Sequence, residues 1–62
     1  MFKLARKLED GFRSVLCTDG KFHAETSVGR RYKLKTYKTE AGARRAAAGW
    51  NAAIDYCVVE AI

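Results

Sequence analysis

A chain of 62 residues lies close to the lower limit for a domain that folds alone, so we expect a single domain over residues 1–62, with about a dozen side chains in its core. Such a core leaves little room for a buried active-site cleft, and no catalytic constellation is visible, so we expect neither an enzyme nor a cofactor. Twelve Lys and Arg residues against seven Asp and Glu residues give a net charge of +5 and a pI near 9.6, which favours an anionic partner over a small-molecule substrate. No apolar run approaches transmembrane length and no signal peptide is visible, so we expect no membrane partner.

Residues 1–9 fit two structures. Phe2, Leu4 and Leu8 alternate as in a β-strand, although the apolar residues of this stretch fit a helix equally well. The dipeptide Asp10-Gly11 that follows is a hairpin turn signal, and it favours the strand.

Residues 12–17 are a stronger strand candidate, because Phe, Val and Leu stand among residues that favour a pleated sheet. Asp19-Gly20 supplies the next turn, and Val28-Gly29 the one after it. Turn signals thus recur about every nine residues, which is typical of an antiparallel meander with short loops.

Residues 20–39 predict a β-hairpin with one apolar and one basic face, since alternate side chains of a strand point to opposite faces. The apolar face is formed by Phe22, Ala24, Thr26, Tyr32 and Leu34. The opposite face is formed by Lys21, His23, Glu25, Arg31, Lys33 and Lys35. An antiparallel sheet keeps charged residues on its wet face whatever its function. Solubility alone would mix the signs, however, and this face is positive apart from Glu25 and His23, which favours an acidic partner.

A helix is predicted over about residues 40–54, where apolar residues recur at helical spacing. Its N-terminus is capped by the hydroxyl of Thr39. The apolar stripe is formed by Ala43, Ala46, Ala47, Trp50, Ala53 and Ile54. Because the stripe is mostly alanine, the helix can lie close to the sheet with Trp50 as its one large anchor, while Arg44 and Arg45 fall on the outer face.

Residues 56–62 are rich in β-branched side chains, which favours a last strand, although a helical period continues through Cys57 and Ala61. The sequence therefore predicts an α+β fold. Its antiparallel sheet has three strands, or four if an end of the chain adds one, and packs against a single helix in the C-terminal half.

Cys17 and Cys57 are the only cysteines, without a CxxC motif or a histidine at zinc spacing, so we expect no metal site. Buried free thiols in a reducing cytosol are the favoured interpretation, which makes the protein cytoplasmic. A single disulfide between the two is the alternative. His23, the only histidine, lacks triad partners and is expected to be a solvated strand residue.

Three blocks of the sequence together resemble the AP2-like DNA-binding domain. They are FRSV at 12–15, GKFHAE at 20–25 and RRYKLKTYKTEAGARRAA at 30–47. The family has a motif like YRGV, then GKWxAEI, then RxWLGTFxTxEEAAxAYxxAA, in the same order. The arm-type N-terminal domains of phage integrases are similar as well. The resemblance covers about residues 11–53, with a shorter second hairpin loop here.

The AP2-like family docks its three-stranded sheet in the DNA major groove with the helix packed behind. By this resemblance, the positions that contact DNA are Arg13, Lys21, Glu25, Arg31, Lys33 and Thr36, and side-chain alternation adds Lys35. Four departures stand out: Phe22 and Lys33 replace tryptophans of the family, Lys35 replaces a glycine and Leu16 replaces an arginine. Lysine contacts phosphate more readily than base edges, so no sequence preference carries over.

The first functional hypothesis is a small basic protein that binds duplex DNA through the exposed face of its sheet, with Lys and Arg on phosphates. By analogy, a lone domain of this kind indicates a regulator of phage or mobile-element type. The alternative is a small basic interaction module or inhibitor that binds an acidic surface of a partner protein. RNA binding ranks third, because the sheet lacks an aromatic pair for stacking bases.

Overall fold

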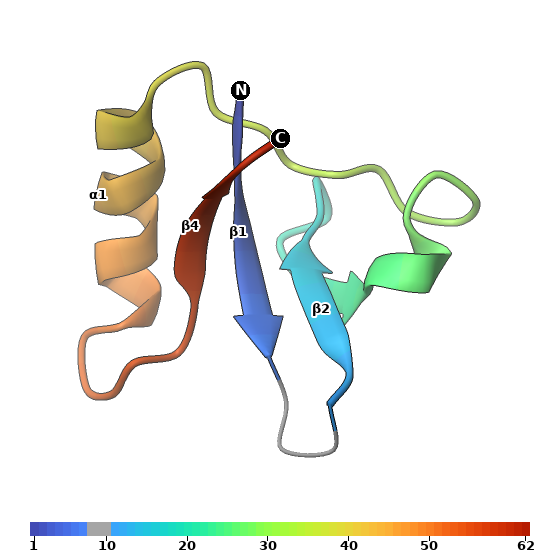
Figure 1. Ribbon diagram of the computed structural model, residues 1–62, viewed down its shortest axis with the longest axis horizontal. Helices are drawn as coiled ribbons and strands as arrows, with labels where there is room; N and C mark the ends of the chain where they lie inside the picture. The colour runs from blue at the N-terminus through green and yellow to red at the C-terminus, as the bar shows by residue number, and fades with distance from the viewer. Residues whose placement is uncertain (8–10) are drawn as a thin grey trace.

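The computed structural model describes residues 1–7 and 11–62 (Figure 1). Leu8 and most of the expected turn at Asp10-Gly11 lie outside the described residues. The elements are β1 (Phe2–Lys7), β2 (Arg13–Leu16), β3 (Phe22–Ala24), a 3-10 helix (Glu25–Ser27), α1 (Glu40–Trp50) and β4 (Val58–Ala61).

The four strands form one antiparallel sheet in the order β3-β2-β1-β4. The N-terminal strand is central: Ala5 of β1 stands opposite Val15 of β2 on one side and Val58 of β4 on the other. The predicted α+β fold is therefore confirmed, with both chain ends forming strands. The meeting of the two ends is what completes the sheet, as Figure 1 shows for the blue and red strands.

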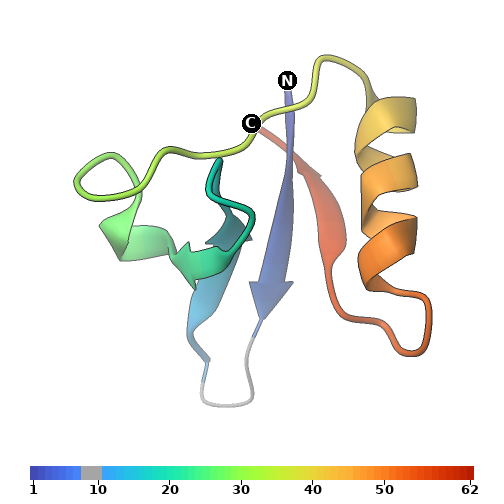
Figure 2. The same ribbon diagram turned by 180° about the vertical axis from the view of Figure 1, so that it is seen from behind.

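Helix α1 packs on one face of the sheet behind β1 and β4, as the rear view in Figure 2 shows. The core between them consists of Leu4, Leu16, Ala43, Ala47 and Cys57. Two alanines on the buried stripe let the helix approach the sheet closely, as the sequence predicted. Thr39 caps the helix as expected, because its hydroxyl accepts a hydrogen bond from the Gly42 amide at 3.1 Å.

The helix ends at Trp50, four residues before the predicted end. Asn51 causes this early stop, since its side chain satisfies the backbone of the chain that turns back toward β4. Its Oδ1 accepts hydrogen bonds from the amides of Tyr56 and Cys57 at 2.7 and 2.8 Å, and its Nδ2 donates to the Cys57 carbonyl at 2.9 Å. Ile54 is consequently exposed, although it continues the helical apolar pattern.

The predicted second strand of the hairpin, residues 31–35, is not a strand of the sheet. The first strand is shorter than expected too, because the chain winds into the 3-10 helix directly after Ala24. Residues 33–37 instead enter the gap where β1 and β2 separate. The Lys35 amide donates to the Leu16 carbonyl at 3.0 Å, and the Thr18 amide donates to the Lys33 carbonyl at 2.9 Å.

Two further hydrogen bonds, both 2.9 Å long, join Tyr37 to Phe2 through the amide and carbonyl of each residue. The pairing of β1 with β2 ends at Ala5 and Val15, so the strand ends beyond it need other partners for their backbone groups. Residues 33–37 supply those partners. This requirement explains why the segment lies along two strands rather than beside β3.

The predicted faces are also partly wrong. Phe22 lies on the helix side of the sheet, with its ring centroid 5.0 Å from that of Trp50. Tyr32 lies on the other side, because it stacks on His23 with centroids 3.4 Å apart. Leu34 pairs with Cys17 rather than packing in the core under α1. The 3-10 helix and the turn at Gly29, whose φ is +89°, carry the chain across to that face.

Trp50 is not the buried anchor that the periodicity predicted, since 40 % of it is exposed. It stands at the last residue of α1, where it contacts Phe22 and Tyr56 rather than the core. The large fully buried side chains are those of Leu4, Val15 and Cys17.

The central position of Leu4 gives a stability prediction. Leu4 is 0 % exposed whereas its isomer Ile54 is 68 % exposed, so the pair isolates the effect of burial. Leu4→Ala should lower the free energy of unfolding by about 2–5 kcal/mol, and Ile54→Ala should change it by no more than about 0.5 kcal/mol. Urea denaturation of the two variants measures both values. Similar losses in both would contradict the assignment of the core.

Cys17 and Cys57 are free and buried, as the favoured interpretation of the sequence had it. Burial raises the pKa of each thiol, because a thiolate is poorly solvated there. We expect both thiols to react with a disulfide reagent at neutral pH much more slowly in the folded protein than in urea, since the thiolate is the reactive form. Mass spectrometry of the labelled protein counts the modified cysteines. Rapid labelling of the native protein would contradict their burial.

Candidate functional site

The net positive charge of the protein resides in one segment. Residues 26–39 hold five cations and no carboxylate: Arg30, Arg31, Lys33, Lys35 and Lys38. Twelve cations less these five leave seven, which equal the seven carboxylates of the rest of the chain. We call residues 30–38 the basic segment.

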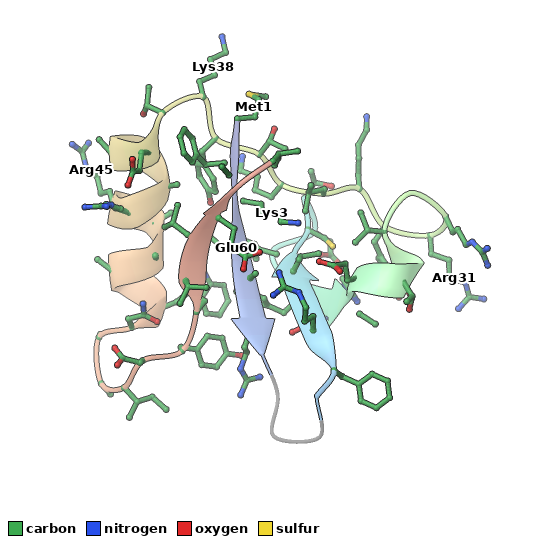
Figure 3. All side chains as sticks on the ribbon, viewed as in Figure 1. Met1, Lys3, Arg31, Lys38, Arg45 and Glu60 are labelled. Carbon is green, nitrogen blue, oxygen red and sulfur yellow. The ribbon has the colours of Figure 1, made fainter. Side chains whose placement is uncertain are left out.

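The basic segment presents its cations outward. Arg31, Lys33 and Lys35 are exposed, whereas Tyr32 and Leu34 between them are half-buried. Lys33 and Lys35 are alternate residues of an extended stretch, so their side chains lie on one side, with their backbones roughly 6.6 Å apart. Arg31 lies in the turn that precedes them. Figure 3 shows the side chains of Arg31 and Lys38, near the two ends of the segment, directed away from the molecule.

The charges of the basic segment are not neutralised within the part of the chain that the structure describes. There, the side chains of Arg30, Arg31, Lys33 and Lys38 have no ion-pair or hydrogen-bond partner. Lys35 contacts the ring of Tyr37, with Nζ 5.5 Å from the centroid, and this contact leaves its charge uncompensated. The segment can therefore offer its full charge to an anionic partner.

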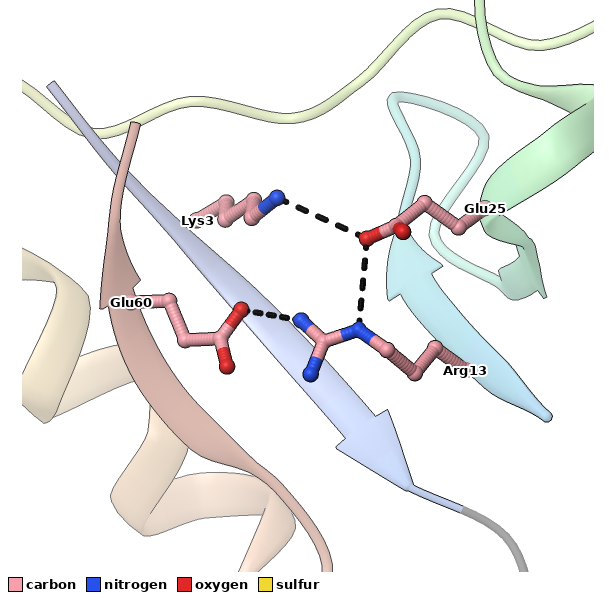
Figure 4. A network of polar contacts seen from close by, with 4 residues as sticks. All are labelled: Lys3, Arg13, Glu25 and Glu60. Atoms are coloured by element: carbon pink, nitrogen blue, oxygen red, sulfur yellow. Dashed lines mark hydrogen bonds and ion pairs between the residues drawn. The ribbon is translucent and has the colours of Figure 1, made fainter. Parts of the chain in front are cut away.

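The sheet face away from α1 carries an ion-pair network of four residues drawn from four elements: Lys3, Arg13, Glu25 and Glu60 (Figure 4). Lys3 Nζ lies 3.6 Å from Glu25 Oε2, and Arg13 Nε donates to the same oxygen at 3.4 Å. Arg13 Nη2 also donates to Glu60 Oε1. The pKa of Arg13 is raised, mainly by the hydrogen bond with Glu60 and next by the negative charge of that carboxylate.

Among the side chains that the structure describes, the ion-pair network leaves this sheet face neutral. Its two cations are matched by two carboxylates. The buried side chains of Ala5 and Val15 lie on the same face, two residues along their strands from Lys3 and Arg13. Glu25, expected by the resemblance to contact DNA, is instead the charge partner of Lys3 and Arg13. Sequence reasoning missed Lys3 and Glu60, because β1 and β4 meet only in the folded sheet.

His23 links the turn before β3 to the basic segment. Its Nε2 lies 2.7 Å from Asp19 Oδ2, and its ring stacks on Tyr32 at an interplanar angle of 7°. Only 18 % of the His23 side chain is exposed, so the expectation of a solvated histidine is wrong. The hydrogen bond with His23 lowers the pKa of Asp19.

A second feature, the aromatic pocket, opens on the helix side of the sheet. Its volume is about 500 Å³, and its aromatic lining consists of Phe12, Phe22, Trp50 and Tyr56. Its cationic lining consists of Arg6, Arg13 and Lys21. The guanidinium carbon of Arg6 lies 4.1 Å from the centroid of the Tyr56 ring, within the range of a cation–π contact. Aromatic spacing in the sequence did not reveal this pocket, because its rings come from three distant stretches.

The seven residues expected at a DNA interface do not form one surface. Arg13 and Glu25 belong to the ion-pair network, and Lys21 is exposed at the aromatic pocket. The other four lie on the basic segment: Arg31, Lys33, Lys35 and Thr36. Arg30 and Lys38 join this segment and were not expected at the site.

Within residues 1–7 and 11–62, His, Cys, Asp and Glu side chains form no group of three or more that would suit a metal ion, and no helix is long and apolar enough to cross a membrane. Comparison with protein-family models, with curated proteins and with solved structures gives no significant match.

The contact of Asp19 with His23 gives a pH prediction. Because the pKa of Asp19 is lower in the folded protein than its ordinary value of 3.8, its carboxylate stabilises the fold above that pH, and the contribution disappears as the pH falls through the folded-state pKa. We expect the Asp19→Asn variant to have a lower urea midpoint than the unsubstituted protein at pH 7. Near pH 2 the two midpoints should be equal. Asp55→Asn, at an exposed carboxylate, is the control and should leave the midpoint unchanged at both pH values. An Asp19→Asn deficit that persists at low pH would contradict the assignment.

Proposed function

We propose that this protein binds DNA, with the basic segment on the phosphate backbone. The observation that supports this most directly is that the whole net charge of the chain lies on residues 30–38, without neutralising partners among the described residues. Neutralised phosphates release condensed counterions, which is the main source of sequence-independent affinity for DNA. The class of protein that this favours is a small basic DNA-binding module.

The hydrogen bonds of residues 33–37 to β1 and β2 hold the central part of the segment in an extended form before any partner arrives. A preorganised surface loses less conformational entropy on binding than a mobile tail of the same charge. This favours the basic segment over the neutral sheet face as the surface that meets DNA. It also departs from the AP2-like expectation, in which the sheet itself enters the major groove.

Lysine and arginine on phosphates position a protein on DNA but do not read base sequence. Arg31, Lys33 and Lys35, all of them exposed, are accordingly suited to contacts with the phosphate backbone. A role as a regulator of phage or mobile-element type is compatible with such a module and forms part of the proposal.

Binding measurements on single substitutions test this proposal. If five phosphates are neutralised, affinity for a duplex should fall on the order of 500-fold between 50 and 200 mM salt. Arg31→Ala and Lys33→Ala should each weaken binding and reduce the slope of log K against log salt by about 0.9, the value for one lost phosphate contact. Fluorescence anisotropy with a labelled duplex measures both quantities.

Arg45→Ala is the matched control, because Arg45 is equally exposed but lies on α1 at the other end of the molecule from Arg31 (Figure 3). It should leave affinity and slope unchanged. All three positions are exposed, so their effects on stability should stay within about 0.5 kcal/mol. Equal effects at all three would show that charge alone drives binding, and absence of binding at low salt would favour an acidic protein as the partner.

A further inference from the structure

We propose that the aromatic pocket receives an unpaired base of single-stranded nucleic acid, whose backbone continues onto the basic segment. This inference rests on the proposed function and assigns the protein a preferred substrate class within it. Three properties of the pocket support base binding: the arrangement of its rings, the sign of its charge and its connection to the basic segment.

The rings of the pocket form one cluster. Trp50 and Tyr56 are nearly parallel, with an interplanar angle of 13° and centroids 5.5 Å apart. The ring of Phe22 stands nearly perpendicular to both, at interplanar angles of 84° and 74° and centroid distances of 5.0 and 5.4 Å. The edge contacts of Phe22 hold the other two rings in place, while 40 % of Trp50 remains exposed at the pocket. Fixed and exposed ring surface is what stacks on a nucleobase in single-strand binding proteins.

The charge of the pocket suits a phosphodiester chain rather than a neutral ligand. Among the described residues its lining includes no carboxylate, and of its three cations Arg13 is already paired with Glu25 and Glu60, so the charge that the pocket can offer comes from Arg6 and Lys21. Arg6 lies over Tyr56, so a positive charge stands beside the ring cluster, and Lys21 is exposed with no ion-pair partner in the described part of the chain. An apolar peptide segment would need neither cation. The volume of about 500 Å³ lies in the usual range of small-ligand sites and accommodates one base with its sugar.

The turn at residues 17–21 connects the pocket to the basic segment. The Cys17 amide donates to the Lys21 carbonyl at 3.0 Å, and the adjacent Thr18 amide donates to the Lys33 carbonyl at 2.9 Å. Lys21 at the pocket and Lys33 on the basic segment therefore flank the same short turn. A strand with one base in the pocket can place its neighbouring phosphates on this line of cations.

A base in a duplex is covered on both faces by its neighbours and shows only its edges in the grooves. Contact between a ring face and Trp50 therefore requires an unstacked base, as in a single strand or at a helix end. The geometry thus favours single strands over duplexes of equal charge. Phe22 and Trp50, which the sequence attributed to the core, thus belong to the selective part of the surface.

A single-stranded oligonucleotide of about ten nucleotides, and the same oligonucleotide with abasic sites at its central positions, form the decisive pair of ligands. They carry the same phosphates and differ only in bases, and the protein is unchanged, so folding cannot confuse the comparison. We expect the abasic ligand to bind about tenfold more weakly, the loss typical of a stacked base. Trp50 is the only tryptophan, so its fluorescence should be quenched by the complete oligonucleotide and little by the abasic one.

Two variants sharpen this test. Trp50→Leu, with its fold checked by circular dichroism, should abolish the discrimination between the two ligands while leaving affinity for the abasic one unchanged. Lys21→Ala should weaken binding of both ligands, and Arg45→Ala, at an exposed cation on α1, should weaken neither.

Equal affinity for the two ligands, with no difference in Trp50 quenching, would overturn the inference. The proposed function would still stand in that case if Arg31→Ala and Lys33→Ala reduced binding. Failure to bind any of these ligands or a duplex at low salt would overturn both.

Discussion

The fold depends on how backbone hydrogen bonds are completed where β1 and β2 separate. These strands pair only as far as Ala5 and Val15, and their ends beyond that point face a gap. An unpaired buried amide or carbonyl costs about 1–3 kcal/mol, which is a large fraction of the stability of a domain this small. Residues 33–37 fill the gap with hydrogen bonds to both strands. A segment that would otherwise be a surface loop thereby becomes a fixed part of the structure between the ends of the two interior strands.

The same constraint organises the charge of the molecule. Holding residues 33–37 extended turns Leu34 toward the protein and Lys33 and Lys35 toward solvent. Carboxylates of the 3-10 helix and β4 meanwhile reach Lys3 and Arg13, so these two cations of the open sheet face are compensated. The uncompensated charge is left on one edge of the molecule, and the aromatic pocket opens beside it across the turn at residues 17–21. The described part of the chain thus presents two distinct surfaces, one basic and one aromatic.

Local sequence patterns correctly predicted the elements whose hydrogen-bond partners lie nearby in the sequence, or whose pattern of apolar residues is strong. The capped alanine stripe placed the start of α1 at Glu40, and the alternation of Phe22 and His23 put these two side chains on opposite faces, as observed. The predicted strand at residues 31–35 failed although its alternation was good. Its hydrogen-bond partners are the ends of β1 and β2, and alternation carries no information about which backbone will be available. Trp50 fitted the helical stripe, yet it lies past the edge of the covered core.

The sequence by itself determined the class of the fold, the free state expected of both thiols and the net positive charge, because periodicity, cysteine spacing and charge are properties of the chain alone. The tertiary structure decided which cations remain available. Arg13 and Lys33 look alike in the sequence, but Arg13 meets Glu60, which is 47 positions away, while Lys33 meets no carboxylate among the described residues. Charge compensation acts through space over a few ångströms, so it follows the register of distant strands rather than the order of residues along the chain.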